Sequence, residues 1–274
     1  MSNRIHILPK SVINLISAGE IADNPHSILK ELIDNSIDAK STKIRINIEN
    51  GGKTLINVID DGFGINKLDI ELAFKNHATS KLSNLDVNTI DHLGFRGEAL
   101  KSISSVSRVS LSSNDSHELE GNKIIYDNGK FISKELIAMN RGTNISVENL
   151  FDVVPARKKF LKKTSIENRL INRLVNKYIF SYPKIAFEYN SSGKKIYNLK
   201  ATSLINRIQE IYGEDLSKNL SELKYESDSV SITGYIGNNN TLRKSTYHQY
   251  YYINNRIIND PFILKQINNS FGLL

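Results

Sequence analysis

The stretch Lys30-Glu31-Leu32-Ile33-Asp34-Asn35-Ser36-Ile37-Asp38-Ala39 carries the clearest structural signal in the chain. It predicts the centre of a helix, because apolar residues in and around it recur every three or four positions. Asp23 or Asn24 can cap the start of this helix, and Pro25 falls in the first turn, where its missing N–H costs nothing. The residues of the apolar face are Ile28, Leu29, Leu32, Ile33 and Ile37. We therefore expect an amphipathic helix that buries this face in a core.

The polar edge of the same helix holds Glu31, Asn35 and Asp38, spaced i, i+4 and i+7. Residues at this spacing share one stripe of a helix. A carboxylate and an amide at the rim of a core can hold a hydrated metal ion and a water. An ordinary solvated face has the same spacing, so motifs elsewhere in the chain must decide between the two interpretations.

Composition places the chain among globular proteins large enough for one large or two ordinary domains. It has 274 residues, 39% of them hydrophobic and 24% charged, with a formal net charge of +7. A basic balance of this size allows contact with nucleic acid without requiring it. Cysteine is absent, which excludes disulfides and thiolate zinc sites and favours a reducing compartment. No apolar run approaches the roughly 20 residues that span a bilayer, so we expect no membrane association and a cytoplasmic location.

Alternating strands joined in hairpins, with helices between them, predict an α+β layered sheet. Lys43–Glu49 and Thr54–Asp60 form one hairpin, and Asp127-Asn128-Gly129 marks the turn of another. The further expected strands are 109–111, 141–150, 185–199 as a hairpin, 230–236 and 247–258. The further expected helices are 11–18, 67–76, one from near Gly97, one within 151–181, 201–212, and one from Asp260.

Three more segments carry residues suited to one ligand. Asp60-Asp61-Gly62-Phe63-Gly64 follows a strand; its carboxylate can read the amine of adenine, and its glycines admit a flat base, although a tight turn uses the same residues. Gly94-Phe95-Arg96-Gly97-Glu98-Ala99-Leu100 opens a helix whose free N–H groups favour phosphate. Thr79-Ser80-Lys81 offers two hydroxyls and an ammonium to phosphate charge.

Together these segments predict an ATP site without a P-loop, because the Walker spacing is absent. In this interpretation Asn35 is the protein ligand of Mg²⁺, and waters and phosphate oxygens complete the shell. Glu31 is the general base for the attacking water. Lys81 and the amides near Gly97 stabilise the charge on the transferred phosphoryl group.

With these motifs the chain resembles the MutL family of DNA mismatch-repair proteins, a branch of the GHKL ATPase superfamily. Two stretches narrow the resemblance to that branch: His77-Ala78-Thr79-Ser80-Lys81 and Gly94 to Leu100. Ile16–Ile21 and Pro155–Leu161 also match, and the resemblance runs from about Ile7 to the last residue. Departures from the family pattern are Asn24 in place of Arg, Val153 in place of Asn, and Asn255 in place of Gly.

The resemblance implies a Bergerat-type ATP-binding fold. This is a two-layer α/β sandwich with a mixed, mainly antiparallel sheet and helices on one face, followed by a partial second α/β domain like domain 2 of a ribosomal protein. It implies domains at 1–200 and 201–274, Glu31 as general base, and Asp60 as the adenine-reading carboxylate. The other implied nucleotide-shell residues are Asn35 (which also binds Mg²⁺), Asp38, Ala39, Gly64, Thr79, Ser80, Lys81, Gly94, Phe95, Arg96, Gly97, Glu98, Ala99, Leu100, Gly142 and Thr143.

The resemblance also implies an ATP-gated clamp in DNA mismatch repair, which couples mismatch recognition to downstream repair factors in a bacterial, nucleoid-associated setting. Implied partners are DNA without sequence preference, the mismatch-recognition protein MutS, a downstream endonuclease or helicase, and a second copy joined in an ATP-dependent dimer of N-terminal regions. A second-domain N-V-H-P-x-K segment is missing, so we expect a truncated second domain and weak hydrolysis. The alternative is a DNA-binding or scaffold fragment that binds nucleotide without effective hydrolysis; a gyrase-type ATPase is disfavoured by the complete Gly94–Leu100 motif.

Basic residues that could contact DNA phosphates lie in both predicted domains. Arg256, in Ile253-Asn254-Asn255-Arg256, matches the family's DNA-contacting arginine. The other candidates are Arg157, Lys158, Lys159, Lys162, Lys163, Arg207, Arg243 and Lys244. For each lysine a solvated surface position is the alternative, and Arg157 could instead pack structurally beside Pro155. Phosphate contacts would give affinity that falls steeply with salt.

Overall fold

The computed structural model describes residues 22–75, 78, 93–94, 97–116, 119–243 and 245–270. The chain forms two compact units, Met1–Val175 with Ile185–Ala201, and Asn176–Lys184 with Thr202–Leu274. The sequence placed the boundary between 200 and 201. The structure divides the chain one residue later and also assigns 176–184 to the second unit, because the Phe180 ring packs there against Tyr212 and Tyr250, with ring centroids 5.5 and 4.9 Å away.

The first unit is built on an eight-stranded sheet in the order β5-β4-β3-β6-β2-β1-β7-β8. The strands are β1 Lys43–Glu49, β2 Leu55–Asp60, β3 Arg108–Asn114, β4 Gly121–Asp127, β5 Lys130–Ile137, β6 Gly142–Glu148, β7 Ala186–Ser191 and β8 Lys194–Leu199. All neighbouring strands are antiparallel except β1 and β7, which are parallel. This confirms the mixed, mainly antiparallel sheet and the hairpins at 127–129 and 191–193.

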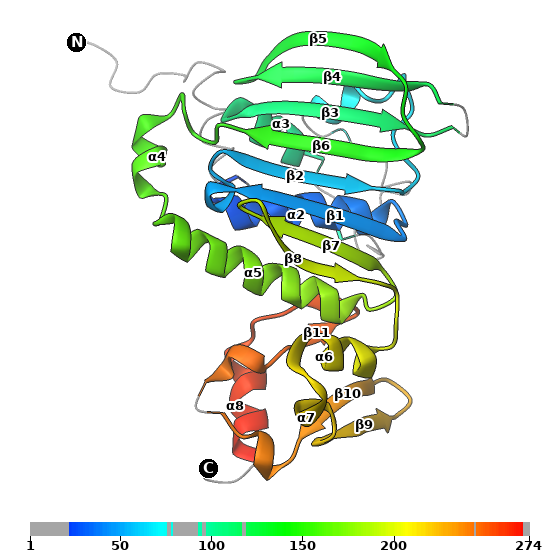
Figure 1. Cartoon of the computed structure of the whole chain (residues 1–274), viewed down its shortest axis with the longest axis vertical. Coiled ribbons are helices and arrows are strands. Elements are labelled where there is room, and N and C mark those ends of the chain that lie inside the picture. The colour runs from blue at the N-terminus through cyan, green and yellow to red at the C-terminus, as the bar shows by residue number, and fades with distance from the viewer. Residues whose placement is uncertain are drawn as a thin grey trace, which may run out of the picture. The chain divides into compact units, whose positions relative to one another are not determined.

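Helices cover one face of this sheet, as Figure 1 shows for α2 Pro25–Asp38 and α3 Ala99–Ser105. Their apolar faces meet the inward side chains of the central strands, and α5 Thr164–Ser181 adds to the same layer. The core residues with no exposed surface include Ile28, Leu29, Ile33, Ile44, Ile46, Ile48, Ile56, Ile103, Val106, Val109, Ile171 and Val175. Each such side chain contributes about 1.5–3 kcal/mol by leaving water, so the two-layer sandwich rests on this layer.

The opposite face of the sheet is polar, which explains why no helix of the described residues forms a second layer over it. Side-chain amides form a row across four strands: Asn190 donates to Asn47 (2.8 Å), Asn47 to Asn57 (2.8 Å), and Asn57 to Asn144 (2.7 Å). The amide of Asn57 also lies 3.0 Å from the Ser146 hydroxyl. Because these groups satisfy one another, the strands can be buried edge to edge without an apolar cover.

The second unit is smaller and contains α6 Leu204–Tyr212, α7 Glu214–Ser217, the antiparallel pair β9 Leu220–Glu226 and β10 Ser231–Gly237, the short pair β11 Tyr252–Ile253 and β12 Arg256–Ile257, and α8 Pro261–Ser270. Asp260 caps α8 by accepting from the N–H groups of Phe262 and Ile263. Asn254 and Asn255 adopt φ of 48° and 61°. Asparagine therefore makes the left-handed turn before Arg256 that the family sequence makes with glycine.

Two sequence expectations differ from the structure, and one strand was not expected. Residues 67–75 form turns and a 3₁₀ segment, Leu72–Phe74, in place of a helix. Leu68 is 78% exposed there, so too few side chains are buried to hold an α-helix. The region 247–258 holds a 3₁₀ turn and the two-residue strands β11 and β12, because the turn at Asn254 interrupts it. Strand β9 was missed, because its side chains are exposed and alternate only weakly.

The helix expected at 11–18 lies outside the described residues. In the described ranges, no helix combines the length and the apolar character needed to cross a bilayer.

Candidate nucleotide-binding site

Helix α2 supplies the polar stripe. Its first turn is set by Asn24, whose side chain accepts from the N–H of Ser27 at 2.9 Å, with Pro25 as the first helical residue. This confirms the predicted cap. Glu31, Asn35 and Asp38 are each half-buried along the helix, so their side chains lie at the boundary between the core and solvent as the stripe predicted.

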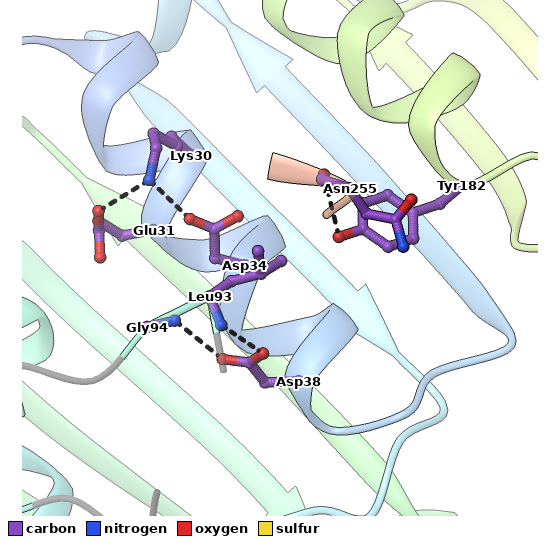
Figure 2. A network of polar contacts seen from close by, with 8 residues as sticks. All are labelled: Lys30, Glu31, Asp34, Asp38, Leu93, Gly94, Tyr182 and Asn255. Atoms are coloured by element: carbon purple, nitrogen blue, oxygen red, sulfur yellow. Dashed lines mark hydrogen bonds and ion pairs between the residues drawn. The ribbon is translucent and has the colours of Figure 1, made fainter. Parts of the chain in front are cut away.

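Lys30 holds the neighbouring carboxylates in an ion pair network (Figure 2). Its ammonium lies 2.7 Å from Asp34 and 3.4 Å from Glu31. The Asp34 side chain is only 5% exposed, whereas that of Glu31 is 29% exposed. Although burial acts to lower it, these two carboxylates raise the pKa of Lys30. Lys30 therefore neutralises the buried Asp34 and also restrains Glu31.

Asp60 ends β2 and faces α2. Its carboxylate accepts from the hydroxyl of Ser36 (2.8 Å) and from the N–H of Gly62 (2.9 Å). Burial raises the pKa of Asp60, and these hydrogen bonds offset only part of that effect. A half-buried acceptor with a raised pKa, held by two donors, is suited to reading a neutral amine such as that of a base.

Asp61 fixes the same turn from its other side. It accepts from the N–H groups of Thr42 (2.7 Å) and Lys43 (2.8 Å), and the Phe63 N–H donates to the carbonyl of Ala39. Although burial acts to raise it, these hydrogen bonds bring the pKa of Asp61 below its usual value. The turn after β2 is thereby joined to the end of α2 and the start of β1.

Thr143 and Ser113 extend the floor of the site from Asp60 across the sheet. Thr143 pairs with Asp60 between β6 and β2, and with Ser113 between β6 and β3. The Ser113 hydroxyl donates to the Gly142 carbonyl (2.9 Å), accepts from the Ile65 N–H (2.8 Å), and lies 3.1 Å from the Thr143 hydroxyl. Register thus brings Asp60 and Thr143 together as the sequence implied.

Close contacts within the protein explain why positions 62 and 64 of the turn are glycine. A Cβ on Gly62 would lie 2.7 Å from the Ala39 side chain and carbonyl. Gly64 has φ of 74°, and a Cβ there would lie 2.0 Å from the Asn114 carbonyl oxygen. The sequence left two explanations for these glycines, the approach of a flat base and a tight turn; the space that a Cβ would occupy is filled by atoms of the protein, which favours the turn.

The glycine-rich segment is tied to α2 by Asp38. Its carboxylate accepts from the N–H groups of Leu93 (2.9 Å) and Gly94 (3.0 Å), and Figure 2 shows it reaching from the helix to that backbone. Gly97 has φ of 62°, and a Cβ there would lie 2.6 Å from the Ala78 carbonyl oxygen. Asp38 was expected near nucleotide, and the contact found is one that positions the segment.

Other expected residues of this segment are only partly described. Glu98, Ala99 and Leu100 form the start of α3, each half-buried. Ala39 follows α2 as its C-cap. Thr79, Ser80, Lys81, Phe95 and Arg96 lie outside the described residues. Sequence reasoning missed Ser36 and Ser113; the available signal was a small polar residue at an inward position of a helix or strand.

The basic residues expected at DNA differ in exposure. Lys158 and Lys159 are exposed on α4 Pro155–Phe160, and Lys158 pairs with Asp152 at 2.7 Å. Arg157 is half-buried, with its guanidinium 5.8 Å from the centre of the Phe151 ring, which favours the packing interpretation. Arg256 is half-buried in the second unit.

Arg207 is not a DNA-contacting residue, contrary to the sequence expectation. It is fully buried, donates to the Pro183 carbonyl at 3.0 Å, and lies 3.5 Å from Glu210. Arg207 lies on the apolar side of α6, so its charge wrongly suggested a contact with DNA.

The fold and the Asp60, Thr143 and α2 arrangement define an ATP-binding module of the GHKL class. The family described as histidine kinase-, DNA gyrase B- and HSP90-like ATPase matches residues 23–155, and the family described as DNA mismatch repair protein, C-terminal domain, matches residues 208–274. The Aquifex aeolicus MutL ATPase domain complexed with ADP is 30% identical, with a TM-score of 0.71, covering 90% of this chain and 87% of that one. The chain belongs to the MutL family of DNA mismatch-repair proteins.

Other relatives agree with this assignment. The MutL protein of Clostridium perfringens is 42% identical over 98% of this chain, and that of Bacteroides fragilis is 38% identical over 100% of it. The chain spans 40% and 44% of the lengths of these two proteins. A crystal structure titled N terminal domain of a DNA repair protein is 26% identical, with a TM-score of 0.80, covering 95% of this chain and 83% of that one.

The packing around Gly64 yields a matched test. Gly64 and Gly193 have φ of 74° and 73°, but a Cβ on Gly193 meets nothing within 4 Å. Gly193→Ala should cost about 1 kcal/mol from backbone strain alone. Gly64→Ala should cost roughly 2–3 kcal/mol more, because it also collides with the Asn114 backbone. Urea unfolding of both variants measures the difference, and equal costs would refute the packing explanation.

The Asp38 contact predicts protection of two amides. Asp38→Ala should raise the hydrogen-exchange rates of the Leu93 and Gly94 amides by on the order of tenfold or more, because each loses a bond to a charged acceptor. Asp127→Ala, on the β4–β5 hairpin, is the control and should leave both amides unchanged. Exchange that does not respond to Asp38 would show that its carboxylate does not hold this segment.

Proposed function

We propose that this chain binds ATP with Mg²⁺ in the site between α2, the turn after β2 and the glycine-rich segment. The observation that carries the proposal is the Asp60 arrangement, in which a half-buried carboxylate lies beside Ser36, Gly62 and Thr143. A base amine would bond Asp60, and phosphates would lie toward Gly94–Leu100. The ADP complex of the Aquifex MutL ATPase domain supports a nucleotide of this kind.

The oxygen-bearing side chain of Asn35 on α2 fits a magnesium ion that is held mainly by water and by phosphate oxygens. No group of three or more His, Asp or Glu side chains in the described ranges could hold a metal by itself. Mg²⁺ keeps several waters and takes phosphate oxygens, so one amide oxygen, that of Asn35, is enough on the protein side. When bound, the ion would neutralise phosphate charge, while Asn35 fixes its place.

Hydrolysis by this chain would be slow because Glu31 is restrained. A general base needs a free lone pair within hydrogen-bond reach of the attacking water. The ammonium of Lys30 lies 3.4 Å from one oxygen of the Glu31 carboxylate, so that oxygen is engaged within the protein. Glu31 would reach the attacking water with that oxygen only when the contact with Lys30 loosens, which would slow turnover.

We further propose the family role, an ATP-gated clamp in DNA mismatch repair. Nucleotide would order the segments around the site, join two copies of the ATPase region, and close them around DNA without reading its sequence. MutS and a downstream endonuclease or helicase are the proposed partners, on the strength of family membership alone. The second candidate, a DNA-binding module without effective hydrolysis, is supported by the paired state of Glu31.

Measurements of nucleotide binding and hydrolysis distinguish the proposed general base, Glu31, from the proposed magnesium ligand, Asn35. Glu31→Gln should bind Mg-ATP within about twofold of the wild type and abolish hydrolysis, because the amide fills the same space but cannot accept a proton. Asn35→Ala should lose most magnesium-dependent affinity. Calorimetry with and without Mg²⁺ and phosphate release measure both effects.

Glu148→Gln is the control for these variants, since Glu148 lies on the polar face of β6. It should match the wild type in binding and hydrolysis. Normal Mg-ATP binding by Asn35→Ala would refute the metal assignment, and hydrolysis by Glu31→Gln would refute the base.

DNA affinity should depend on the exposed lysines of α4. Replacing Lys158 and Lys159 by Gln should reduce the slope of log affinity against log salt by about 2, one for each lost phosphate contact. The adjacent pair Lys194 and Lys195 on β8, equally exposed, is the control. Equal effects of the two pairs, measured by fluorescence anisotropy over a salt series, would place the DNA elsewhere.

A further inference from the structure

A polar cavity lies beside the start of α2, and Asp60 is not part of its lining. It has a volume of about 260 Å³, and its lining includes Asp23, Asn24, His26, Phe160, Lys162 and Glu167. Its walls come from the first turn of α2, the end of α4, and the first turn of α5. All of these residues belong to the first unit.

Glu167 is the unusual residue of this cavity because it is only 1% exposed. One carboxylate oxygen accepts from the N–H of Lys162 at 3.0 Å. The other oxygen is buried and has no hydrogen-bond partner in the part of the chain that the structure describes. Leaving a charged acceptor buried and unsatisfied costs more than an ordinary hydrogen bond contributes, so this oxygen calls for a donor.

His26 presents a second unsatisfied acceptor position. Its Nδ1 is buried and has no hydrogen-bond partner among the described residues. Burial lowers the pKa of His26, although Glu167 and Asp23 act against this, so the ring is neutral at pH 7 and one of its nitrogens can accept. Asn24 is already committed, because its side-chain oxygen caps α2 through Ser27.

A cation with several donors would satisfy both positions and would also neutralise the acidic lining. Asp23 and Glu167 are acidic, Lys162 has an exposed side chain, and no ion pair of the described residues joins Lys162 to Glu167. A bare metal ion is disfavoured, because these residues do not form a group able to hold one. A guanidinium has five N–H donors in a planar fork that matches a carboxylate, with donors left for an imidazole.

We propose that this cavity is a guanidinium-binding site, with the free oxygen of Glu167 as its anchor and His26 as its second acceptor. Its ligand class is an arginine side chain presented from outside this set of residues, or a small guanidinium compound. The site is independent of nucleotide binding, so it stands or fails separately from the proposed function.

Ethylguanidinium is a direct probe, with ethylammonium at the same concentration as the control for charge. In the wild type the probe should produce saturable NMR shifts at the Lys162 amide and the His26 ring, and ethylammonium should produce much smaller ones. Glu167→Gln should abolish the response, because its amide keeps the Lys162 contact but loses the charge. Glu148→Gln should respond like the wild type. Absence of a saturable shift in the wild type would overturn the proposal.

A tethered guanidinium gives a test that does not depend on the probe. Asn24→Arg and Asn24→Met both lose the cap on Ser27, but only arginine brings a guanidinium to the cavity wall. The folding equilibrium constant of Asn24→Arg should exceed that of Asn24→Met by on the order of tenfold or more, the effect of a hydrogen bond to a charged group. In the Glu167→Gln background this difference should vanish. Equal stability of the two Asn24 variants with Glu167 intact would overturn the site.

Discussion

The turn after β2 depends on two adjacent carboxylates, and the rest of the site depends on that turn. Asp60 accepts from α2 through Ser36, and Asp61 accepts from the backbone at the start of β1 through Thr42 and Lys43. One dipeptide thus fixes the end of a helix against two strands. Their pKa values move in opposite directions: burial raises that of Asp60, whereas at Asp61 the hydrogen bonds outweigh burial and lower it.

The opposite pKa shifts of Asp60 and Asp61 make the stability of the turn depend on pH. Asp60 has a raised pKa in the folded chain, so its ionisation opposes folding as the pH rises through that pKa. Asp61 has a lowered pKa, so its contribution is present above the ordinary carboxylate pKa and is lost as the pH falls through the folded value. The contribution of Asp61 to the turn is therefore present at neutral pH, whereas burial of Asp60 works against its charged form and a ligand that donates to Asp60 would offset that effect.

The sequence predicted the parts of the fold that local patterns determine. The helix with Pro25 at its start and the hairpin at Asn128 follow from capping and turn chemistry. The segment 67–75 could not be predicted, because its apolar residues have helical spacing but only some are buried. Arg207 was wrongly expected to contact DNA for a related reason. Its burial depends on packing, which a single arginine in a sequence does not reveal.

In the site, too, local motifs were predictable and contacts made only by tertiary packing were not. The positions of Glu31 and Asn35 on the edge of α2 and of Asp60 at the end of β2 were predictable, because each belongs to a motif of fixed spacing. Ser36 and Ser113 were not, since their roles arise only when β2, β6 and β3 align in register. The role of Asp38 changed for the same reason, because its partners Leu93 and Gly94 are distant in sequence. α2 thus links two parts of the proposed site: Glu31 and Asn35 lie on the polar edge of the helix, and Asp38 on the same edge holds the backbone of Leu93 and Gly94, so one helix fixes the position of that backbone relative to Glu31 and Asn35.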